Sequence, residues 1–498
     1  MAAPPISRRH ALPALALFAA VGAVAAGLTG QDAGFDLRNY HWYDAWAALH
    51  GRLGVDVAPA QLQTFFNPAL DLVYYGLLTT LGAAAGTIAM GALHGVMPGL
   101  ACLLSWRLLP PATGRLPLAL LCGASAAYAP VFAAGVGTAQ GDLLVGALVL
   151  AGVLSLLGPP DRSDRNALVW GALTGMALGL KPTASAFVLA GLPLVILRGG
   201  RSGLARAFTG GLLGWAVAGG VWAGVLAVRF DSPVFPMAND LFQSDWAAHD
   251  HFFDQGYFPS GADWVLLPVR IAIGGEHAWF YSWRDARLLV LLLVGGAWAM
   301  RRRDDPDVTH LLLWAAIAYL VWLRSSAMIR YLAPLEAAAP ALLVACVARL
   351  LPRRGFAVGA TALLALALWQ ELPDYERVGF SDPPLGVVLP PLPSGPAPTV
   401  VSAGDAANSY IAPSFPPQWR HVRVVSSVLW HEDQTLLHAA AAQVLREADP
   451  VLLLTGQEGE VQAEALRSFG LRADLSRCLP VLSPLDEGIV LCEVSRLP

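Results

Sequence analysis

The chain has 498 residues, of which 56% are apolar and only 14% are charged, and its mean hydropathy is +0.53. Soluble globular proteins carry about 25% charged residues, so this composition indicates a membrane protein. The formal net charge is −4 and no segment forms a basic stripe, which argues against a nucleic acid partner. No CxxC, HExxH or Walker-type motif occurs, so we expect no cofactor, and a divalent metal stays an open alternative that no motif supports.

The first apolar run covers residues 11–29 and follows Arg8 and Arg9, which places the N-terminus in the cytoplasm by the positive-inside rule. A membrane-spanning helix needs about 20 apolar residues, and later runs approach this length at 86–106, 116–134, 142–158, 167–180, 184–198, 207–228, 286–300, 309–323, 332–350 and 355–370. We therefore expect an α-helical polytopic protein of the bacterial inner membrane, with about eleven transmembrane helices within residues 1–375.

Clusters of arginine occur in alternate loops between these runs, as at Arg107 and Arg115 or at Arg301, Arg302 and Arg303. The positive-inside rule makes these loops cytoplasmic. The long segments 30–85 and 229–285, together with the C-terminal tail, then lie on the outer face of the membrane.

The first outer segment is rich in polar and aromatic residues directly after a span. Read as an α-helix, one face carries residues at offsets 0, 3, 4, 7 and 8, which are Asp36, Asn39, Tyr40, Tyr43 and Asp44. Two carboxylates and two phenols on one strip suit the binding and activation of a polar group. The alternative is an interfacial helix whose aromatic residues form a belt at the membrane surface. The residues alone do not decide between the two.

Further ionisable residues lie at the outer ends of later spans. Asp142 opens the fourth span, Lys181 follows the fifth, and Arg330 and Tyr331 precede the tenth, which carries Glu336. Charges at such depth are costly and mark either function or pairing. Snorkelling would explain Lys181 and Arg330, and a buried pair or cap would explain Asp142 and Glu336. One cavity at the outer surface would unify all of them.

The last part of the chain has the composition of a soluble protein. Residues 376–398 form a Pro-rich linker, expected to be extended and semi-rigid. Residues 399–498 predict a small extracytoplasmic α/β domain, with strands at 399–402, 451–454 and 489–494 and helices at 433–446 and 459–469. If this domain is extracytoplasmic, a disulfide between Cys478 and Cys492 is plausible.

The pattern resembles the GT-C superfamily of integral membrane glycosyltransferases, which includes protein mannosyltransferases and aminoarabinose transferases. The features that carry the resemblance begin with an acid after the first span, Asp36, and an Asn-Pro that leads into an outer helix, at Asn67, Pro68 and Asp71. An acid, Asp142, opens the fourth span, and a lysine, Lys181, follows the Gly-rich fifth span after Gly179. The tenth span is marked by an Arg-Tyr and a proline, at Arg330, Tyr331 and Pro334. Many family members have a second acidic residue next to the first, but here Leu37 follows Asp36. The resemblance therefore gives no support for a bound metal.

The resemblance implies transfer of a sugar from a polyprenyl-phosphate carrier to a glycan, lipid or protein acceptor at the outer face of the membrane. It assigns Asp36 as the base or acceptor-orienting residue, with Asp44 as a substitute. Cations would hold the phosphate, and the candidates are Arg38, Lys181 and Arg330. The remaining substrate-binding candidates are Asn39, Tyr40, Tyr43, Asn67, Asp142 and Tyr331, while membrane lipid would surround the spans.

Two other classes of protein are compatible with the sequence. A transporter or lipid flippase should carry polar residues in mid-span and broken helices at matching positions, whereas this chain keeps its polar residues near one surface. A non-catalytic envelope assembly protein would use the C-terminal domain as its binding module, and removal of residues 383–498 would then abolish all function.

Overall fold

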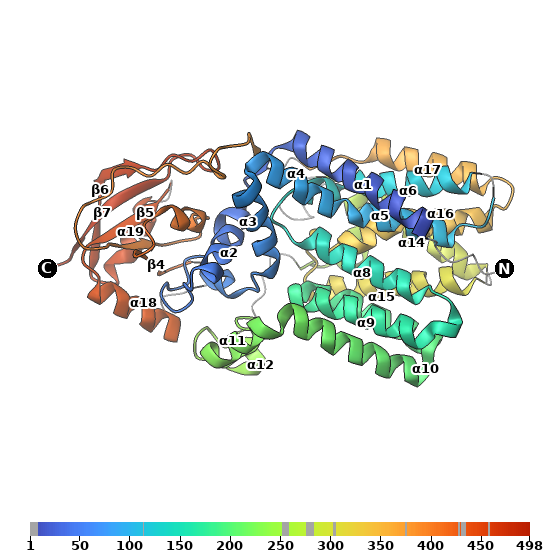
Figure 1. Ribbon diagram of the computed structural model, residues 1–498, viewed down its shortest axis with the longest axis horizontal. Helices are drawn as coiled ribbons and strands as arrows, with labels where there is room; N and C mark the ends of the chain where they lie inside the picture. Colours follow the sequence, from blue (N-terminus) through green and yellow to red (C-terminus); the bar gives the residue numbers. More distant parts are fainter. Residues whose placement is uncertain are drawn as a thin grey trace.

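The computed structural model describes residues 8–112, 114–250, 258–274, 283–301, 305–373, 376–426, 429, 435–456 and 459–498. A bundle of apolar helices forms one half of the molecule and a small α/β domain forms the other (Figure 1). The first described helix, α1 (Arg8–Thr29), begins at the end of the bundle far from this C-terminal domain (Figure 1). One end of the bundle therefore faces the C-terminal domain, and the opposite end does not.

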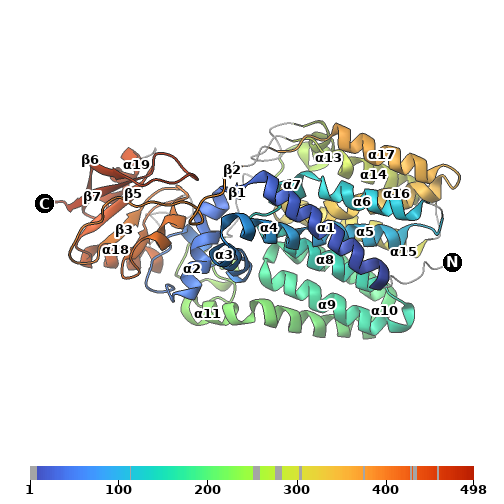
Figure 2. The same cartoon turned by 45° about the horizontal axis from the view of Figure 1, so that its top comes forward.

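The bundle consists of helices that match the predicted apolar runs: α1 (Arg8–Thr29), α4 (Ala83–His94), α5 (Val96–Leu108), α6 (Arg115–Ala127), α7 (Pro130–Gly135), α8 (Asp142–Leu156), α9 (Ser163–Leu180), α10 (Ser185–Trp215), α11 (Val221–Phe230), α14 (Arg287–Met300), α15 (Pro306–Ser325), α16 (Ala333–Leu350) and α17 (Gly355–Trp369). Helix α16 is central and almost wholly buried, whereas α1 crosses the outside of α4 and α5 (Figure 2). A largely exposed apolar helix such as α1 has the surface that lipid requires.

Within the described residues, five helices are long and apolar enough to cross a membrane, or six if the bent pair α8 and α9 counts as one span. Four more apolar helices are shorter, at Ala69–Leu81, Arg115–Ala127, Arg287–Met300 and Gly355–Trp369. The structure therefore supports a polytopic helical protein, and the number of eleven spans remains a prediction.

The predicted runs 184–198 and 207–228 lie in one helical segment. Its backbone kinks at Gly200, whose φ of 57° is in the left-handed region. The segment after the break packs closely on α9. A Cβ added at Gly171 would lie 2.0 Å from the carbonyl oxygen of Ala207, and one added at Gly175 would lie 2.2 Å from that of Gly211. Small residues at these positions let the two backbones touch, as in many membrane helix pairs.

The first outer segment forms a compact layer between the bundle and the C-terminal domain (Figure 1). It contains β1 (Gln31–Asp32), a π-helix η1 (Leu37–His41), α2 (Trp42–Leu49), a 3₁₀-helix η2 (Gln61–Phe65) and α3 (Ala69–Leu81). The second outer segment contributes α12 (Asn239–Phe242) and α13 (Asp263–Ile273), and its residues 251–257 and 275–282 lie outside the described part.

The C-terminal domain is a five-stranded sheet in the order β4-β3-β5-β7-β6, with β3 (Thr399–Ser402), β4 (Arg420–Arg423), β5 (Val451–Thr455), β6 (Leu471–Pro480) and β7 (Val490–Arg496). Helices α18 (Leu436–Glu447) and α19 (Gly459–Arg467) complete it. The predicted strands and helices are confirmed. Strands β4 and β6 were not predicted, because they are rich in charged residues and lack an apolar run.

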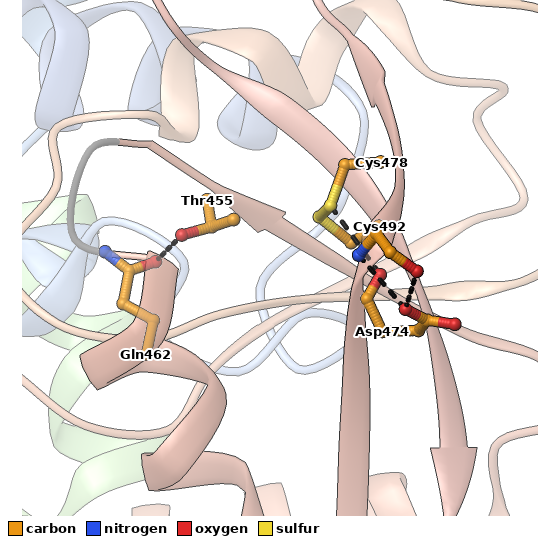
Figure 3. The surroundings of a disulfide bond; sticks show 6 residues. Thr455, Gln462, Asp474, Cys478 and Cys492 are labelled. Atoms are coloured by element: carbon orange, nitrogen blue, oxygen red, sulfur yellow. Dashed lines mark hydrogen bonds between the residues drawn. A yellow bond between two sulfur atoms is a disulfide. The ribbon is translucent and has the colours of Figure 1, made fainter.

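The disulfide between Cys478 and Cys492 is present and links neighbouring strands β6 and β7, in which the two cysteines stand opposite each other (Figure 3). A covalent link of this kind is typical of oxidising compartments outside the cytoplasm.

The Pro-rich segment 376–398 contacts the rest of the molecule in its first half, whereas most of residues 391–397 are exposed. It begins with β2 (Arg377–Val378), which pairs antiparallel with β1, and its Leu385 is buried. The outer segment and the C-terminal domain also share one hydrophobic core, in which Val57 lies beside Val422. The C-terminal domain is therefore packed on the outer segment, and its sheet is extended there by one residue bridge.

Candidate functional site

Four of the predicted charged residues meet at the end of the bundle that faces the C-terminal domain. Arg330 forms an ion pair with Asp36, and Nζ of Lys181 lies 2.7 Å from Oδ1 of Asp142. The two pairs are linked, because Nε of Arg330 lies 3.9 Å from Oδ2 of Asp142. We call these residues, together with Tyr331, the outer charge cluster.

Each member of the outer charge cluster stands where a helix begins or ends. Asp142 is the first residue of α8, and Lys181 follows the last residue of α9. Arg330 and Tyr331 belong to a 3₁₀-turn, η8 (Ile329–Leu332), that leads into α16. Asp142 at the N-terminus of α8 and Lys181 at the C-terminus of α9 therefore both interact favourably with the dipole of their helix.

Tyr331 supplies the aromatic face of the cluster. Nζ of Lys181 lies 5.0 Å from the centre of its ring and the guanidinium of Arg330 lies 5.3 Å from it. Both distances suit cation–π attraction. The side chains of Lys181 and Arg330 are 17% and 23% exposed, so the two cations are ordered but still reachable from one side.

The carboxyl group of Asp36 is held in its ionised form. Burial raises the pKa of this group, but the positive charges of Arg330, His41 and Lys181 outweigh that effect and lower the pKa below its usual value. An ionised acid in this place can accept a hydrogen bond from a hydroxyl group and orient it.

The structure divides the strip that was expected on one helical face. The carboxylate of Asp36 bonds to Arg330. The hydroxyl of Tyr43 instead donates a hydrogen bond to Oδ2 of Asp56, and this oxygen also accepts one from Nε of Arg52. The reason is the π-helix η1: its hydrogen bonds run from residue i to i+5, so the register of an α-helix does not hold across residues 37–41. Tyr43 therefore belongs to the contact with the C-terminal domain.

Asp44 is also placed away from the cluster. It is 3% exposed, and neither carboxylate oxygen has a hydrogen-bond partner among the described residues. Burial, and after it the charge of Asp71, raises the pKa of Asp44 well above its usual value. Its burial without a described partner gives no support to Asp44 as a substitute base.

Arg38 and Asn67 are engaged in contacts between parts of the fold. The guanidinium of Arg38 lies 2.8 Å from Asp486 and 3.3 Å from Glu376. The amide of Asn67 donates to the carbonyl oxygens of Gly179 and Ala218, at 2.8 and 2.9 Å. Arg38 thus ties the outer segment to the C-terminal domain, and Asn67 ties it to the bundle.

Asn39 and Tyr40 are both buried. Asn39 is wholly buried, and neither its amide nitrogen nor its oxygen has a hydrogen-bond partner in the described part of the chain. The ring of Tyr40 lies 4.0 Å from that of His41 and 5.6 Å, edge to face, from that of Phe66. Burial, followed by the negative charge of Asp36, raises the pKa of Tyr40 well above its usual value.

Sequence reasoning missed His41. Its Nδ1 lies 2.6 Å from Oδ1 of Asp71, and both side chains are more than nine-tenths buried. His41 stands five residues after Asp36, a spacing that a π-helix aligns and an α-helix does not. A histidine inside the polar stretch was the only available signal.

A small pocket, partly open to solvent, lies beside η8, the turn that carries Arg330 and Tyr331. Its apolar wall includes Ile329 and Leu332, which flank Arg330 and Tyr331, and its polar wall includes Asp285, Arg287 and Glu336. The carboxylate of Glu336 accepts from the backbone N–H of Val131, at 3.2 Å, so this residue is part of the wall. In the described residues, no three or more His, Cys, Asp or Glu side chains are grouped so that they could hold a metal ion.

No known protein-family model matches this chain, and no curated protein matches it either. Two solved structures do: ArnT, an aminoarabinose transferase of the GT-C type, from Cupriavidus metallidurans, once bound to undecaprenyl phosphate and once in the apo state. The TM-scores are 0.53 and 0.52 at 15% sequence identity, and each match covers 96% of this chain and 97% of the other. The likeness shows that this chain shares the overall fold of ArnT.

Proposed function

We propose that this protein transfers a sugar from a polyprenyl-phosphate carrier to a cell-envelope acceptor at the outer face of the inner membrane. The observation that carries the proposal is the outer charge cluster, in which two cations and an ionised acid meet beside a pocket with an apolar wall. A lipid-borne donor needs both: cations for its phosphate and an apolar surface for its chain.

The chemistry follows from the charges. A sugar bonded to a phosphate already has a good leaving group, so the protein has to hold the phosphate and orient the attacking hydroxyl. Arg330 and Lys181 would exchange their carboxylate partners for the phosphate oxygens. Asp36 would bind the acceptor hydroxyl, either as the base or as the orienting group, and Tyr331 would contact the sugar.

The fold likeness adds support of a general kind, because one of the two ArnT structures holds undecaprenyl phosphate. The arrangement of the chain fits the proposed topology, with the start of α1 and the C-terminal domain at opposite ends of the bundle (Figure 1). A cytoplasmic N-terminus and a periplasmic C-terminal domain would put the cluster on the outer face. The sugar, a hexose or a pentose, would be selected by groups beyond the cluster.

A transfer assay tests the proposal. Purified protein in proteoliposomes is given radiolabelled polyprenyl-phosphate sugars and an envelope fraction of the producing organism, and label in the acceptor and free polyprenyl phosphate are both measured. We expect Asp36→Asn to lose transfer by at least about 100-fold, since positioned acid–base groups contribute roughly 10²–10⁴ in rate. The matched control is Asp161→Asn, which changes an exposed acid in the 3₁₀-turn before α9. Absence of transfer by the unaltered protein from every such donor would reject the proposal.

A further inference from the structure

Asp36 lies in a short stretch of chain that is held on both of its sides by the C-terminal part of the protein. On the N-terminal side of this stretch, β1 pairs antiparallel with β2 at the junction between the bundle and the C-terminal domain (Figure 2). The backbone N–H of Ala33 also donates to the carbonyl oxygen of Glu376, at 3.1 Å. The chain is therefore fixed to the segment that leads into the C-terminal domain three residues before Asp36.

The residues that follow Asp36 in η1 contact the C-terminal domain itself. Leu37 is 1% exposed and belongs to a hydrophobic core that also contains Leu485, which lies between β6 and β7. The hydroxyl of Ser409 donates to the carbonyl oxygen of Asn39. Apolar packing is non-directional, whereas a hydrogen bond sets the distance and the direction between two groups. The polar contacts of η1 therefore determine its exact placement on the domain.

Arg38 makes the most specific of these polar contacts. Its Nη1 lies 2.8 Å from Oδ2 of Asp486, between β6 and β7, and its Nη2 lies 3.3 Å from Oε2 of Glu376. The side chain of Arg38 is only 16% exposed. Because both terminal nitrogens of the planar guanidinium are bound to carboxylates, its orientation relative to the C-terminal domain is fixed.

The backbone of η1 connects Arg38 to the acid of the outer charge cluster. Asp36 is the N-cap residue of η1 and Arg38 is the second residue of this helix, so a single residue separates them. The N–H of Arg38 donates to the carbonyl oxygen of Gly34, at 3.2 Å, and this bond spans Asp36. A π-turn is rare and is frequently found at functional sites. The position of the Asp36 carboxylate relative to Arg330 thus depends on where η1 is held.

We propose that Asp486 and Glu376 position Asp36 for the transfer reaction by holding Arg38. Arg38 is then a positioning residue and not a ligand of the phosphate. The inference rests on the proposed function and deepens it, because it assigns a part in the reaction to a domain that contains no member of the outer charge cluster. The placement of Asp36 matters because a shift of a reacting group by about 1 Å can cost roughly 10²-fold in rate.

A phosphate-binding role for Arg38 predicts different kinetics. Loss of a cation that binds the donor raises the KM for the donor, whereas misplacement of Asp36 lowers kcat and leaves this KM unchanged. An exchange of the two charges separates the roles a second time. An ion pair that positions η1 holds it with either orientation of its charges, but a carboxylate at position 38 cannot bind phosphate.

The test is steady-state sugar transfer in proteoliposomes with radiolabelled polyprenyl-phosphate sugars. We expect Asp486→Asn to lower kcat by about five-fold and Asp486→Lys, which repels Arg38, by about 30-fold, with the KM for the donor within about two-fold of its original value. Arg38→Asp should lower kcat as far as Asp486→Lys does. Addition of Asp486→Arg to Arg38→Asp, with Glu376→Gln so that no second acid stands opposite position 38, should recover most of this loss. Glu493→Gln is the matched control, because this exposed acid of the same domain pairs with Arg477.

Recovery of kcat by the charge exchange supports the inference. A folded exchange variant that remains as slow as Arg38→Asp overturns it, and so does a folded Asp486→Lys variant with unaltered kcat, whatever its thermal stability or KM. If the exchange variant does not give a folded, monodisperse protein, kcat and KM of Asp486→Asn and Asp486→Lys decide the question. Failure of the unaltered protein to transfer any sugar is a separate result, which rejects the proposed function and this role of Arg38 together.

Discussion

Both ends of the helical bundle carry ion pairs, but Arg107 and Arg349 at the N-terminal end differ in their partners from Lys181 and Arg330 of the outer charge cluster. At the N-terminal end, Arg107 and Arg198 share Asp307 at 2.9 and 2.7 Å, and Arg349 lies 2.6 Å from Asp305. Arg107 also donates to the carbonyl oxygen of Leu157 and Arg349 to that of Leu108. Leu108 ends α5 and Leu157 caps α8.

Carbonyl groups in the last turn of a helix have no partner within the helix, so these arginines complete the helices they touch. In the outer charge cluster, the described side-chain contacts of Lys181 and Arg330 are to carboxylates and to Tyr331, and none of these is to a backbone carbonyl. A cation that bonds to a backbone carbonyl at a helix end stabilises the fold, and it cannot leave that carbonyl without loss of this stabilisation. One that is paired only with side chains can exchange its partner for a ligand.

The largest effect expected from this difference is the loss of activity in Arg330→Gln. The change removes one of two phosphate-binding cations and leaves Asp36 without its partner, so transfer should fall by about 100-fold or more, mainly through the KM for the donor. The transfer assay measures it, with Arg324→Gln at the end of α15 as the control. Equal activity of both variants would show that the outer charge cluster is as structural as the ion pairs at the opposite end.

A smaller effect is expected from acid on the layer between the outer segment and the C-terminal domain. His421 in β4 is 4% exposed, and burial lowers its pKa from 6.5 to about 4, with the charge of Asp56 opposing the shift and that of Arg52 adding to it. The unfolded chain therefore binds this proton at a higher pH than the folded one. Stability should be constant well above pH 6.5 and fall by about 3 kcal/mol as the pH is lowered to about 4.

Thermal unfolding followed across that pH range measures the loss. His421→Gln should flatten the dependence in this window, and His438→Gln, which changes a half-buried histidine in α18, should keep it. A pH dependence that survives in His421→Gln would assign the acid sensitivity to other groups.

At the N-terminal end the expected effect is on stability alone. Arg349→Gln removes an ion pair and two bonds to backbone carbonyls, those of Ala345 and Leu108, so the free energy of unfolding should fall by about 1 kcal/mol. Transfer activity of the folded protein should stay within about two-fold of the unaltered protein. A loss of activity larger than the loss of folded protein would contradict the comparison between the two ends.

Much of the fold follows from local patterns in the sequence. Apolar runs gave the positions of most bundle helices, and the runs at 399–402 and 451–454 gave two strands of the sheet. The charges at Asp142, Lys181 and Arg330 stood out because acids and cations at the ends of apolar runs are unusual. Their meeting in one cluster required only that they lie at the same end of the bundle.

The parts that escaped prediction depend on contacts between distant segments or on an uncommon backbone. Helical periodicity predicted that Asp36, Tyr43 and Asp44 share a face, and the π-helix at 37–41 breaks that periodicity. Arg38 looks like a phosphate ligand until Asp486, more than 400 residues later in the chain, is seen beside it. No local signal reveals such a pairing, because either residue alone is ordinary for a polar surface.

The smallest effect is expected from chelation of divalent metal. In the proposed mechanism Arg330 and Lys181 carry the charge of the phosphate, so EDTA should change the transfer rate by less than about two-fold. The measurement is the transfer assay with EDTA and, separately, with added Mg²⁺ or Mn²⁺. A loss of activity that either metal restores would mean that Asp36 and Asp142 bind a cation and that their ion pairs with Arg330 and Lys181 are replaced during the reaction. In that case both ion pairs of the outer charge cluster would break when the donor binds. The carboxylates of the cluster, like its cations, would then change partners, whereas the arginines at the N-terminal end would keep theirs.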